Sequence, residues 1–334
     1  MKKIGILGAG SWGTALSLLL CNNGHQVTVW SAIEDEIKML KECHEHKDKL
    51  PGIPLPENIG FTTDLKEAIQ DKDLLVLAVP SPFTRSTSKS MKEYVQQGQI
   101  IVNVAKGVEE NTMMTLTEII KEEIPQAVVT VLSGPSHAEE VGRGLPTTCV
   151  VGAEDEQTAK EIQEIFMNSV FRVYTSDDVL GIELGGALKN VIALAAGVAD
   201  GLGYGDNIKA ALITRGISEI SRLGVVMGGR KETFGGLTGI GDLIVTCASM
   251  HSRNRRAGIL IGKGYTMEEA MAEVKMVVEG VYSAKAALQL AQKYQVEMPI
   301  IEQVCAVLFE GVPAVEAVDV LMNREGKSEL EKEK

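Results

Sequence analysis

Residues 4–20 read IGILGAGSWGTALSLLL, and this stretch decides the fold of the chain. It begins with a short apolar run typical of a buried parallel strand, continues with a G-x-G-x-x-G pattern and ends in a run that favours a helix. Gly8 allows a tight turn, Gly10 lets the backbone approach a pyrophosphate, and Gly13 lets the helix pack on the strand. The start of that helix would offer free N–H groups and the positive end of its dipole to phosphates. The stretch therefore predicts a dinucleotide-binding site rather than a merely structural turn.

Length and composition narrow the class of protein. The 334 residues are enough for two domains, and 33 Lys plus Arg against 45 Asp plus Glu give a net charge of −12. Such an acidic chain argues against a nucleic-acid partner. The 5 cysteines are scattered without CxxC spacing, which favours a reducing compartment. The chain enters a strand directly and no apolar run reaches transmembrane length, so we expect a cytoplasmic protein without membrane insertion.

Strand-like and helix-like segments alternate in the first half of the chain. Apolar runs predict strands at residues 4–7, 26–30, 73–79, 99–105, 127–132, 149–152 and 171–174. Helix-like segments follow the first strand and occupy residues 83–95 and 111–123. This alternation indicates right-handed βαβ crossovers, and we predict an α/β domain with a Rossmann-type, mainly parallel sheet over residues 1–176.

After residue 176 the alternation stops. Segments rich in Ala and Leu predict helices at residues 179–202, 207–223, 267–271, 281–294, 300–309 and 315–322. We therefore predict an all-helical domain over residues 177–325, followed by a charged tail at 326–334 that is too weakly apolar to pack.

The end of the second predicted strand leaves the cofactor preference open. An NAD-type fold usually places an acidic residue there, and an NADP-type fold an arginine. Residues 30–33, WSAI, carry no charge, and Glu34, Asp35 and Glu36 are expected to begin the next helix.

A short cluster, Cys43-His44-Glu45-His46, weakly resembles a metal site. It lacks a partner ligand at zinc-like spacing, so we expect a solvated polar loop and no metal.

Polar residues stand where predicted parallel strands end. Lys106 follows one strand, and Gly134 and Ser136 follow another. Ligands of open α/β sheets bind at this rim, which favours a substrate role for Lys106 over that of an ordinary surface lysine.

The helical part holds two further candidates. Lys189 stands in the middle of an apolar helical run, and the lack of polar neighbours favours a buried functional amine over a snorkelling surface lysine. Ser252, Arg253 and Asn254 place a hydroxyl, a guanidinium and an amide side by side, which suits a phosphate dianion. Asp242 stands shortly before these residues and is a further candidate for the polar site. The alternatives to a ligand site are that Asp242 caps a helix and that the arginines form a solvated surface patch. A nucleic-acid site would need interleaved aromatics and a basic domain, and aromatics make up only 4% of the chain.

Taken together, these motifs resemble the bacterial-type NAD(P)-dependent glycerol-3-phosphate dehydrogenase family over nearly the whole chain. The resemblance rests on GAGSWGTAL from Gly8, VAKGVE from Val104, SGPSHAEEV from Ser133, ELGGALKNVIALAAGVADGLGYGDN from Glu183, TRGISEI from Thr214, TFGGLTGIGDLIVTC from Thr233, SRNRRAG from Ser252 and VVEGV from Val277. The family implies a Rossmann domain plus a helical domain. It also implies NAD(P)H-dependent reduction of dihydroxyacetone phosphate to sn-glycerol 3-phosphate, a phospholipid precursor.

The resemblance also implies residue roles. Lys189 is implied as the proton-transferring lysine, with Lys106 beside it. The cofactor is expected at Gly8, Gly10, Ser11, Trp12, Gly13, Lys106, Ala138, Arg253, Val277 and Glu279. The phosphorylated substrate is expected at Lys106, Gly134, Ser136, Lys189, Asp242, Ser252, Arg253 and Asn254.

Two positions depart from the family pattern. No basic residue follows the tryptophan of the second strand, where Ser31 and Ala32 stand, so a preference for NADP is not implied. His137 replaces the usual phenylalanine of GPSFA, which changes packing near Ser136 without removing an implied role.

The chemistry of ketone reduction agrees with these residues. Hydride attack leaves negative charge on the carbonyl oxygen, to which Lys189 can give a proton with Lys106 as electrostatic support. Burial and neighbouring cations would lower the pKa of Lys189 and Asp242 would resist this, so the net direction is open.

Three alternatives stay open at this point. They are a β-hydroxyacid or imine dehydrogenase of the same two-domain plan, a non-catalytic dinucleotide sensor, and a nucleic-acid binder through residues 252–256. The −12 charge argues against the third, and the pair of lysines against the second. The expected partner is a small phosphorylated molecule, and a homodimer stays open.

Overall fold

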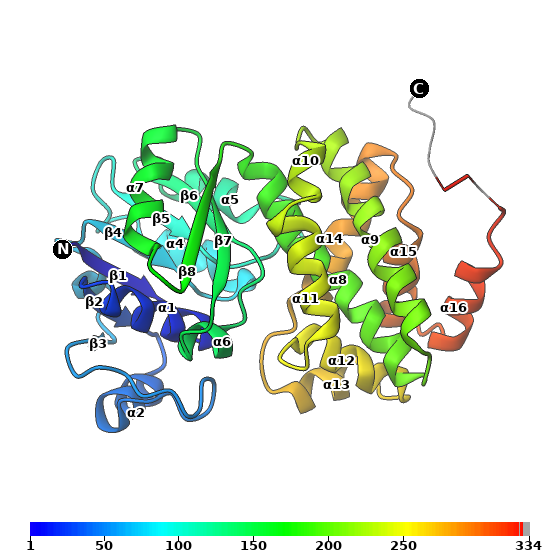
Figure 1. The fold of residues 1–334 in the computed structure, drawn as a ribbon, viewed down its shortest axis with the longest axis horizontal. Helices are drawn as coiled ribbons and strands as arrows, with labels where there is room; N and C mark the ends of the chain where they lie inside the picture. Colours follow the sequence, from blue (N-terminus) through cyan, green and yellow to red (C-terminus); the bar gives the residue numbers. More distant parts are fainter. Residues whose placement is uncertain (327, 330–334) are drawn as a thin grey trace.

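The computed structural model describes residues 1–326 and 328–329, and Figure 1 shows a sheet-containing part beside a helical part. The predicted fold class is confirmed: an α/β part with a mainly parallel sheet is followed by helices alone. β8 ends at Ser176 and α8 begins at Val179. The boundary between two domains at residue 176 stays a prediction. Most of the predicted tail at 326–334 lies outside the described residues.

The sheet has eight strands in the order β3-β2-β1-β4-β5-β6-β7-β8. The strands are β1 (Lys3–Leu7), β2 (Gln26–Trp30), β3 (Gly60–Thr62), β4 (Leu74–Leu77), β5 (Ile100–Asn103), β6 (Val128–Ser133), β7 (Thr147–Gly152) and β8 (Phe171–Ser176). Neighbouring strands pair in parallel except for β6 and β7, which are antiparallel. The carboxyl ends of β1, β4, β5 and β6 therefore lie at one edge, where ligands of such sheets bind.

Helices cover both faces of the sheet (Figure 1). They are α1 (Ser11–Asn22), α2 (Glu34–Cys43), α3 (Leu65–Ile69), the 3-10 turn η1 (Ser81–Phe83), α4 (Thr84–Met91), α5 (Leu116–Glu123), α6 (Ala138–Gly142) and α7 (Glu156–Phe166). The predicted helix at 83–95 is shorter, because residues 81–83 form the 3-10 turn η1 and α4 ends at Met91. The predicted helix at 111–123 begins only at Leu116. Thr115 pairs with Val108 and caps α5 through a capping box, so the preceding residues form a loop.

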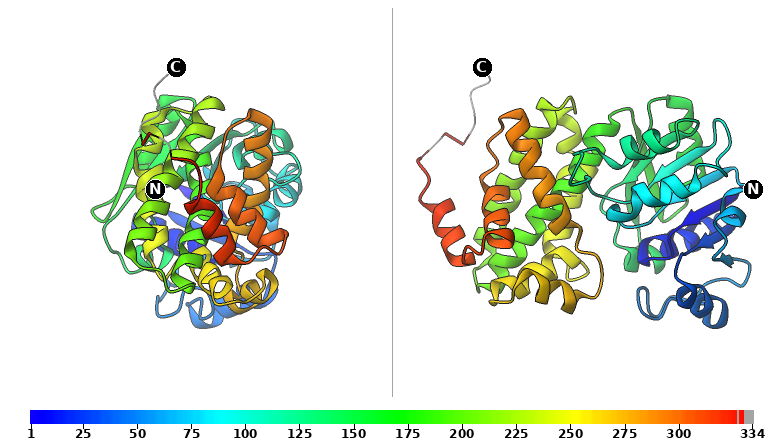
Figure 2. Two further views of the ribbon diagram at one scale, coloured as in Figure 1. Left: turned by 90° about the vertical axis from the view of Figure 1, so that its right-hand side faces the viewer. Right: turned by 180° about the vertical axis from the view of Figure 1, so that it is seen from behind.

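In the described residues after β8, every secondary-structure element is a helix. These elements are α8 (Val179–Gly201), α9 (Asp206–Val226), α10 (Lys231–Phe234), the π-helical segment η2 (Leu237–Gly241), α11 (Asp242–Ala248), α12 (Arg253–Gly262), α13 (Met267–Val274), α14 (Glu279–Tyr294), α15 (Pro299–Phe309) and α16 (Ala314–Met322). Figure 2 shows α16 at the end of the molecule far from the sheet.

α8 forms the centre of the helical part, and α12 packs on it backbone against backbone. A Cβ at Gly197 would lie 2.1 Å from the carbonyl oxygen of Arg255, and one at Gly258 would lie 2.2 Å from that of Leu194. Glycine is therefore required at this crossing, which brings the start of α12 close to the middle of α8.

α8 is also long and apolar enough to cross a membrane, and a bent pair, residues 231–248 with 253–262, would meet the same criterion if counted as one span. In the described residues, 89% of the most apolar window of α8 is buried inside the protein.

Candidate active site

The loop between β1 and α1 has the shape of a phosphate-binding turn. Gly8 has a φ of 122°, and a Cβ there would lie 2.7 Å from the carbonyl carbon of Ala78. A Cβ at Gly13 would lie 1.9 Å from the oxygen of Gly8, whereas nothing lies within 4 Å of the corresponding position at Gly10. Two glycines thus make the turn and the close helix contact, and the third leaves open space beside the N-terminus of α1, the place where dinucleotide-binding folds hold a pyrophosphate. Ser11 and Trp12, both half-buried, form the first turn of that helix.

Two lysines and one aspartate come together between the sheet and α8. Lys106 Nζ lies 2.6 Å from Asp242 Oδ2, and Lys189 Nζ lies 2.8 Å from Asp242 Oδ1. Lys106 also donates to the carbonyl oxygen of Gly134 at 3.0 Å, and Lys189 donates to Thr246 Oγ1 at 2.6 Å. Residues 53 and 136 positions apart in the sequence therefore form one charged cluster, and with Gly134 it combines four of the residues expected at the substrate.

Burial and the charges of its own members together set the pKa values of this cluster. Lys189 is 6% exposed and Asp242 is 1% exposed. Burial lowers the pKa of Lys189 to about 8, with Lys106 adding to the effect and Asp242 opposing it. For Asp242, burial alone would raise the pKa, but the charges of Lys106 and Lys189 outweigh it and lower the pKa. The expectation that Lys189 is buried is confirmed, and the direction of its pKa shift, which the sequence left open, is downward.

Asp242 does not cap a helix with its side chain, so that alternative is wrong. The N-cap of α11 is Gly241, and the carboxylate of Asp242 instead accepts hydrogen bonds from the two lysines. The π-helical segment just before it packs closely on its neighbours, because a Cβ at Gly239 would lie 2.0 Å from the oxygen of Phe234. π-helical segments are frequent at functional sites. Here the segment leads into Asp242, whose carboxylate contacts Lys189 on α8.

The start of α12 supplies the other polar residues expected at the substrate. Ser252 caps the helix, since its Oγ accepts from the N–H of Arg255 at 3.2 Å. Asn254 is buried, donates to Asn190 Oδ1 at 2.9 Å and accepts from the N–H of Gly280 at 2.8 Å. Asn254 thus links α8, α12 and α14, which leaves one amide N–H for a ligand.

The arginines of α12 differ in their surroundings. Arg255 forms an ion pair with Asp200 at 2.7 Å, so it does not belong to a solvated patch. Burial lowers the pKa of Arg253, whose half-buried guanidinium makes no hydrogen bond to another described residue. Glu279 and Glu139 act on it through their charges, but its hydrogen-bond donors are not taken up by described residues, which suits an anionic ligand.

The residues after β6 line the same space. Gly134 has a φ of 148°, and Ser136 Oγ donates to its carbonyl oxygen at 3.0 Å. Ala138 is buried at the start of α6. His137 lies with its ring 5.7 Å from that of His251, and its buried Nε2 has no partner among the described residues.

Glu279, one of the residues expected to bind the cofactor, connects the helical part of the protein to the sheet-containing part. Glu279 Oε1 accepts from the N–H of Ser81 at 3.1 Å, and Ser81 Oγ donates to Glu279 Oε2. Burial raises the pKa of Glu279. Val277, just before α14, is half-buried. Ser81 was not singled out from the sequence, although its place after β4 puts it at the ligand-binding edge of the sheet.

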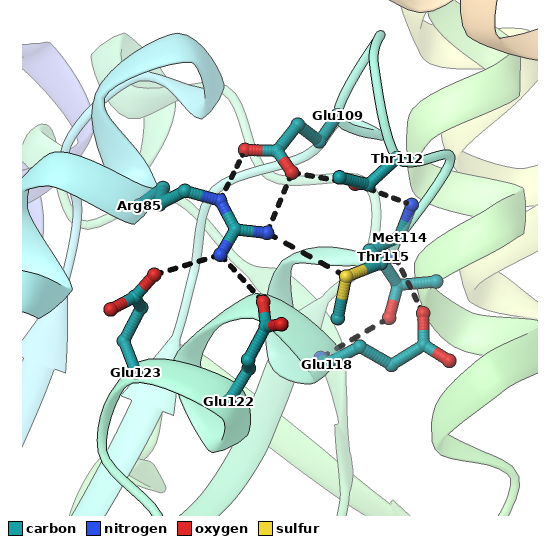
Figure 3. A network of polar contacts seen from close by, with 8 residues as sticks. All are labelled: Arg85, Glu109, Thr112, Met114, Thr115, Glu118, Glu122 and Glu123. Carbon is teal, nitrogen blue, oxygen red and sulfur yellow. Dashed lines mark hydrogen bonds and ion pairs between the residues drawn. The ribbon is translucent and has the colours of Figure 1, made fainter.

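An ion-pair network, shown in Figure 3, connects the loop that follows Lys106 to α4 and α5. Arg85 on α4 donates to both carboxylate oxygens of Glu109, at 2.8 and 2.7 Å, and also to Glu122 and Glu123 on α5. Glu109 accepts a further hydrogen bond from Thr112 at 2.5 Å. This network fixes the loop 106–112 against two helices of the sheet part.

The expected solvated loop at residues 43–46 is only partly found. Cys43 is exposed, but His46 is only 1% exposed and lies beside Glu36, with 3.9 Å between Nε2 and Oε1. Among the described residues, no group of three or more His, Cys, Asp or Glu is arranged to hold a metal ion. All five cysteines are free thiols.

A sheet whose first strand ends in a glycine turn, next to a helical part with a buried lysine cluster between them, is the arrangement of a nicotinamide-dependent dehydrogenase. Two family models match the chain: NAD-dependent glycerol-3-phosphate dehydrogenase N-terminus over residues 3–159, and NAD-dependent glycerol-3-phosphate dehydrogenase C-terminus over residues 178–319. The chain belongs to the NAD-dependent glycerol-3-phosphate dehydrogenase family, as the sequence motifs predict.

Individual relatives agree with this assignment. The chain is 68% identical over 329 residues to the glycerol-3-phosphate dehydrogenase [NAD(P)+] of Agathobacter rectalis, covering 98% of each chain. It is 63% identical over 333 residues to that of Fusobacterium nucleatum, covering 99% of each. The crystal structure of glycerol-3-phosphate dehydrogenase from Coxiella burnetii superposes with a TM-score of 0.94 at 38% identity, covering 97% of this chain and 99% of that one. A ketopantoate reductase from Ralstonia eutropha, at 15% identity and a TM-score of 0.61, shares the fold alone.

Proposed function

We propose that this chain reduces dihydroxyacetone phosphate to sn-glycerol 3-phosphate with NAD(P)H, reversibly, and that Lys189 exchanges the proton with the substrate oxygen. The observation that carries the proposal is the buried cluster in which Asp242 Oδ1 holds Lys189 Nζ at 2.8 Å. The bound cofactor would supply the hydride. The chain's own residues would bind the two ligands, fix the carbonyl group and move the proton.

Lys189 is suited to give the proton because of its surroundings. A lysine with its ordinary pKa of about 10.4 holds its proton too tightly for rapid exchange near neutrality. Burial lowers the pKa of Lys189 to about 8, closer to the value that favours proton transfer in both directions. Asp242 and Thr246 orient the ammonium group, which would point its remaining N–H toward the carbonyl oxygen.

Lys106 would act beside it as a fixed positive charge. Its ammonium is tied to Asp242 and to the carbonyl oxygen of Gly134, so it is preorganised before the substrate binds. As negative charge develops on the carbonyl oxygen, such a group stabilises it without reorganisation.

The phosphate of the substrate would lie at the start of α12. Arg253 offers a fork of donors there, Ser252 a hydroxyl and Asn254 its remaining amide N–H. The cofactor would lie along the loop of Gly8 to Gly13 and reach toward Ala138, Val277 and Glu279. We further propose a cytoplasmic enzyme that feeds phospholipid synthesis, with domains at residues 1–176 and 177–325, and leave open a homodimer.

A substrate panel tests the proposed function. Dihydroxyacetone phosphate should support NAD(P)H oxidation, whereas ketones bearing a carboxylate in place of the phosphate should not, because Arg253 and Ser252 are arranged for a phosphate. Turnover of a carboxylated ketone at a rate equal to that of dihydroxyacetone phosphate would favour the β-hydroxyacid dehydrogenase alternative.

The pH dependence of both directions should follow the pKa of Lys189, about 8. Ketone reduction needs the protonated lysine, so kcat/KM should be level below that pKa and fall above it. Oxidation of sn-glycerol 3-phosphate needs the neutral amine, so its kcat/KM should rise toward that pKa and then level off. The profiles are measured above the second phosphate pKa of about 6, so that the substrate stays a dianion.

Asp242→Asn provides the control for this assignment. The charge of Asp242 raises the pKa of Lys189, so its removal should move both inflections to lower pH. Two profiles that keep the same inflection in wild type and Asp242→Asn would assign the titration to another group.

A further inference from the structure

A carboxylate does stand at the end of β2, although the sequence places none there. Glu36 lies in the first turn of α2, and its Oε2 accepts a hydrogen bond from Ser31 Oγ at 2.7 Å. Ser31 is the residue directly after β2, and its Oγ also accepts from the N–H of Ile33 at 3.2 Å. The hydroxyl proton of Ser31 is therefore committed to Glu36, and the helix turn brings the acid back to the strand end.

This strand end lies beside the phosphate-binding turn. The N–H of Gly8 donates to the carbonyl oxygen of Trp30 at 2.9 Å, so Ser31 directly follows the residue that anchors the glycine loop. In dinucleotide-binding folds, an acid at this place accepts hydrogen bonds from the adenosine ribose, and its charge opposes a 2′-phosphate.

Charged and titratable groups of α2 and of the loop after it surround Glu36. Lys49, from the loop after α2, forms an ion pair with Oε1 of Glu36. His46 lies 3.9 Å from the same oxygen, and burial lowers its pKa, so it is neutral at neutral pH. Glu34 and Asp35 share the first turn of α2 but are exposed. Glu36 thus forms one ion pair with a lysine and is only 9% exposed, which makes it a fixed rather than a mobile group.

We propose that Glu36, held by Ser31 and Lys49, is the specificity-determining residue for the adenosine ribose and makes the chain prefer NADH to NADPH. Each carboxylate oxygen keeps a lone pair for a ribose hydroxyl. A 2′-phosphate placed there would meet the buried carboxylate, and it would have to draw Lys49 away from Glu36 to be neutralised. This inference rests on the proposed function only in that the ligand is a nicotinamide dinucleotide.

Binding measured without substrate tests the proposal separately from catalysis. Isothermal titration calorimetry with NADH and NADPH should show NADH bound at least ~10-fold more tightly by the wild type. Glu36→Gln keeps an acceptor for Ser31 but removes the charge and releases Lys49, so the NADH-to-NADPH ratio should move by at least ~10-fold toward NADPH. Most of that change should be tighter NADPH binding.

Two further variants keep the test decisive. Asp35→Asn removes an equal charge from the same helix turn at an exposed position and should leave the ratio within about 2-fold of the wild type, since surface charges act weakly. Lys49→Met removes the neutralising cation and should move the ratio further toward NADH. A wild type that binds NADPH as tightly as NADH would overturn the proposal, and so would equal shifts in Glu36→Gln and Asp35→Asn. Loss of reductase activity with these binding ratios intact would count against the proposed function alone.

Discussion

Replacing Lys189 with methionine should lower kcat for dihydroxyacetone phosphate reduction by at least ~100-fold, the low end for loss of a general acid. Methionine keeps the length and helix propensity of lysine but carries no proton. The pair of Lys106 and Asp242 stays intact in this variant, so no carboxylate is left without a cation. NAD(P)H affinity and thermal stability should stay close to those of the wild type. KM should change less than kcat, because the donor matters most as the alkoxide forms.

The control for this variant is Lys209→Met. Lys209 forms an ion pair with Asp200 on the same helical part, away from Asp242, and its loss should leave kcat nearly unchanged. A Lys189→Met enzyme that keeps more than about a tenth of the wild-type kcat would move the proton-donor role to another group, first to Lys106.

Replacing Arg253 with alanine should cost at least ~2 kcal/mol in kcat/KM for dihydroxyacetone phosphate, the loss expected for a charged hydrogen-bonded pair. Its guanidinium donates no hydrogen bond to a described residue and interacts with Glu279 and Glu139 through charge, so little of the fold depends on it. The loss should be much smaller with unphosphorylated dihydroxyacetone, which has no phosphate for the arginine to bind.

Arg256→Ala is the matched variant, since it removes the same charge from the next turn of α12. Steady-state measurements of kcat/KM with dihydroxyacetone phosphate and with dihydroxyacetone should distinguish the Arg253→Ala and Arg256→Ala variants. Equal losses on the phosphorylated and unphosphorylated ketones in Arg253→Ala would remove the phosphate from its assigned place.

The fold was largely predictable because its signals are local. The apolar runs at 4–7 and 99–105 match β1 and β5, and the change of texture after residue 176 matches the start of the helices. β3, only three residues long, was missed because it carries no recognisable run. The 231–262 region was not recognised as helical, because its glycines obscure the helical periodicity and the close packing of its π-helical segment on α8 cannot be seen in the local sequence.

The site was predictable where residue type conflicts with its surroundings. A lysine in an apolar helix pointed to Lys189, and three polar residues in a row pointed to the start of α12. Thr246 and Ser81 gave no such signal, because their roles arise from contacts with residues distant in the sequence. Glu36 was interpreted as a helix-starting acid, which it is, but its bond back to Ser31 depends on the turn between strand and helix.

The central claim, that this chain catalyses the reaction of its family, is tested most directly by product stoichiometry. Purified enzyme is given NADH or NADPH with dihydroxyacetone phosphate, each cofactor titrated separately, and cofactor loss is compared with the sn-glycerol 3-phosphate formed. We expect one molecule of sn-glycerol 3-phosphate for each molecule of NAD(P)H oxidised. Tight cofactor binding without oxidation would contradict the account and would instead indicate a dinucleotide sensor.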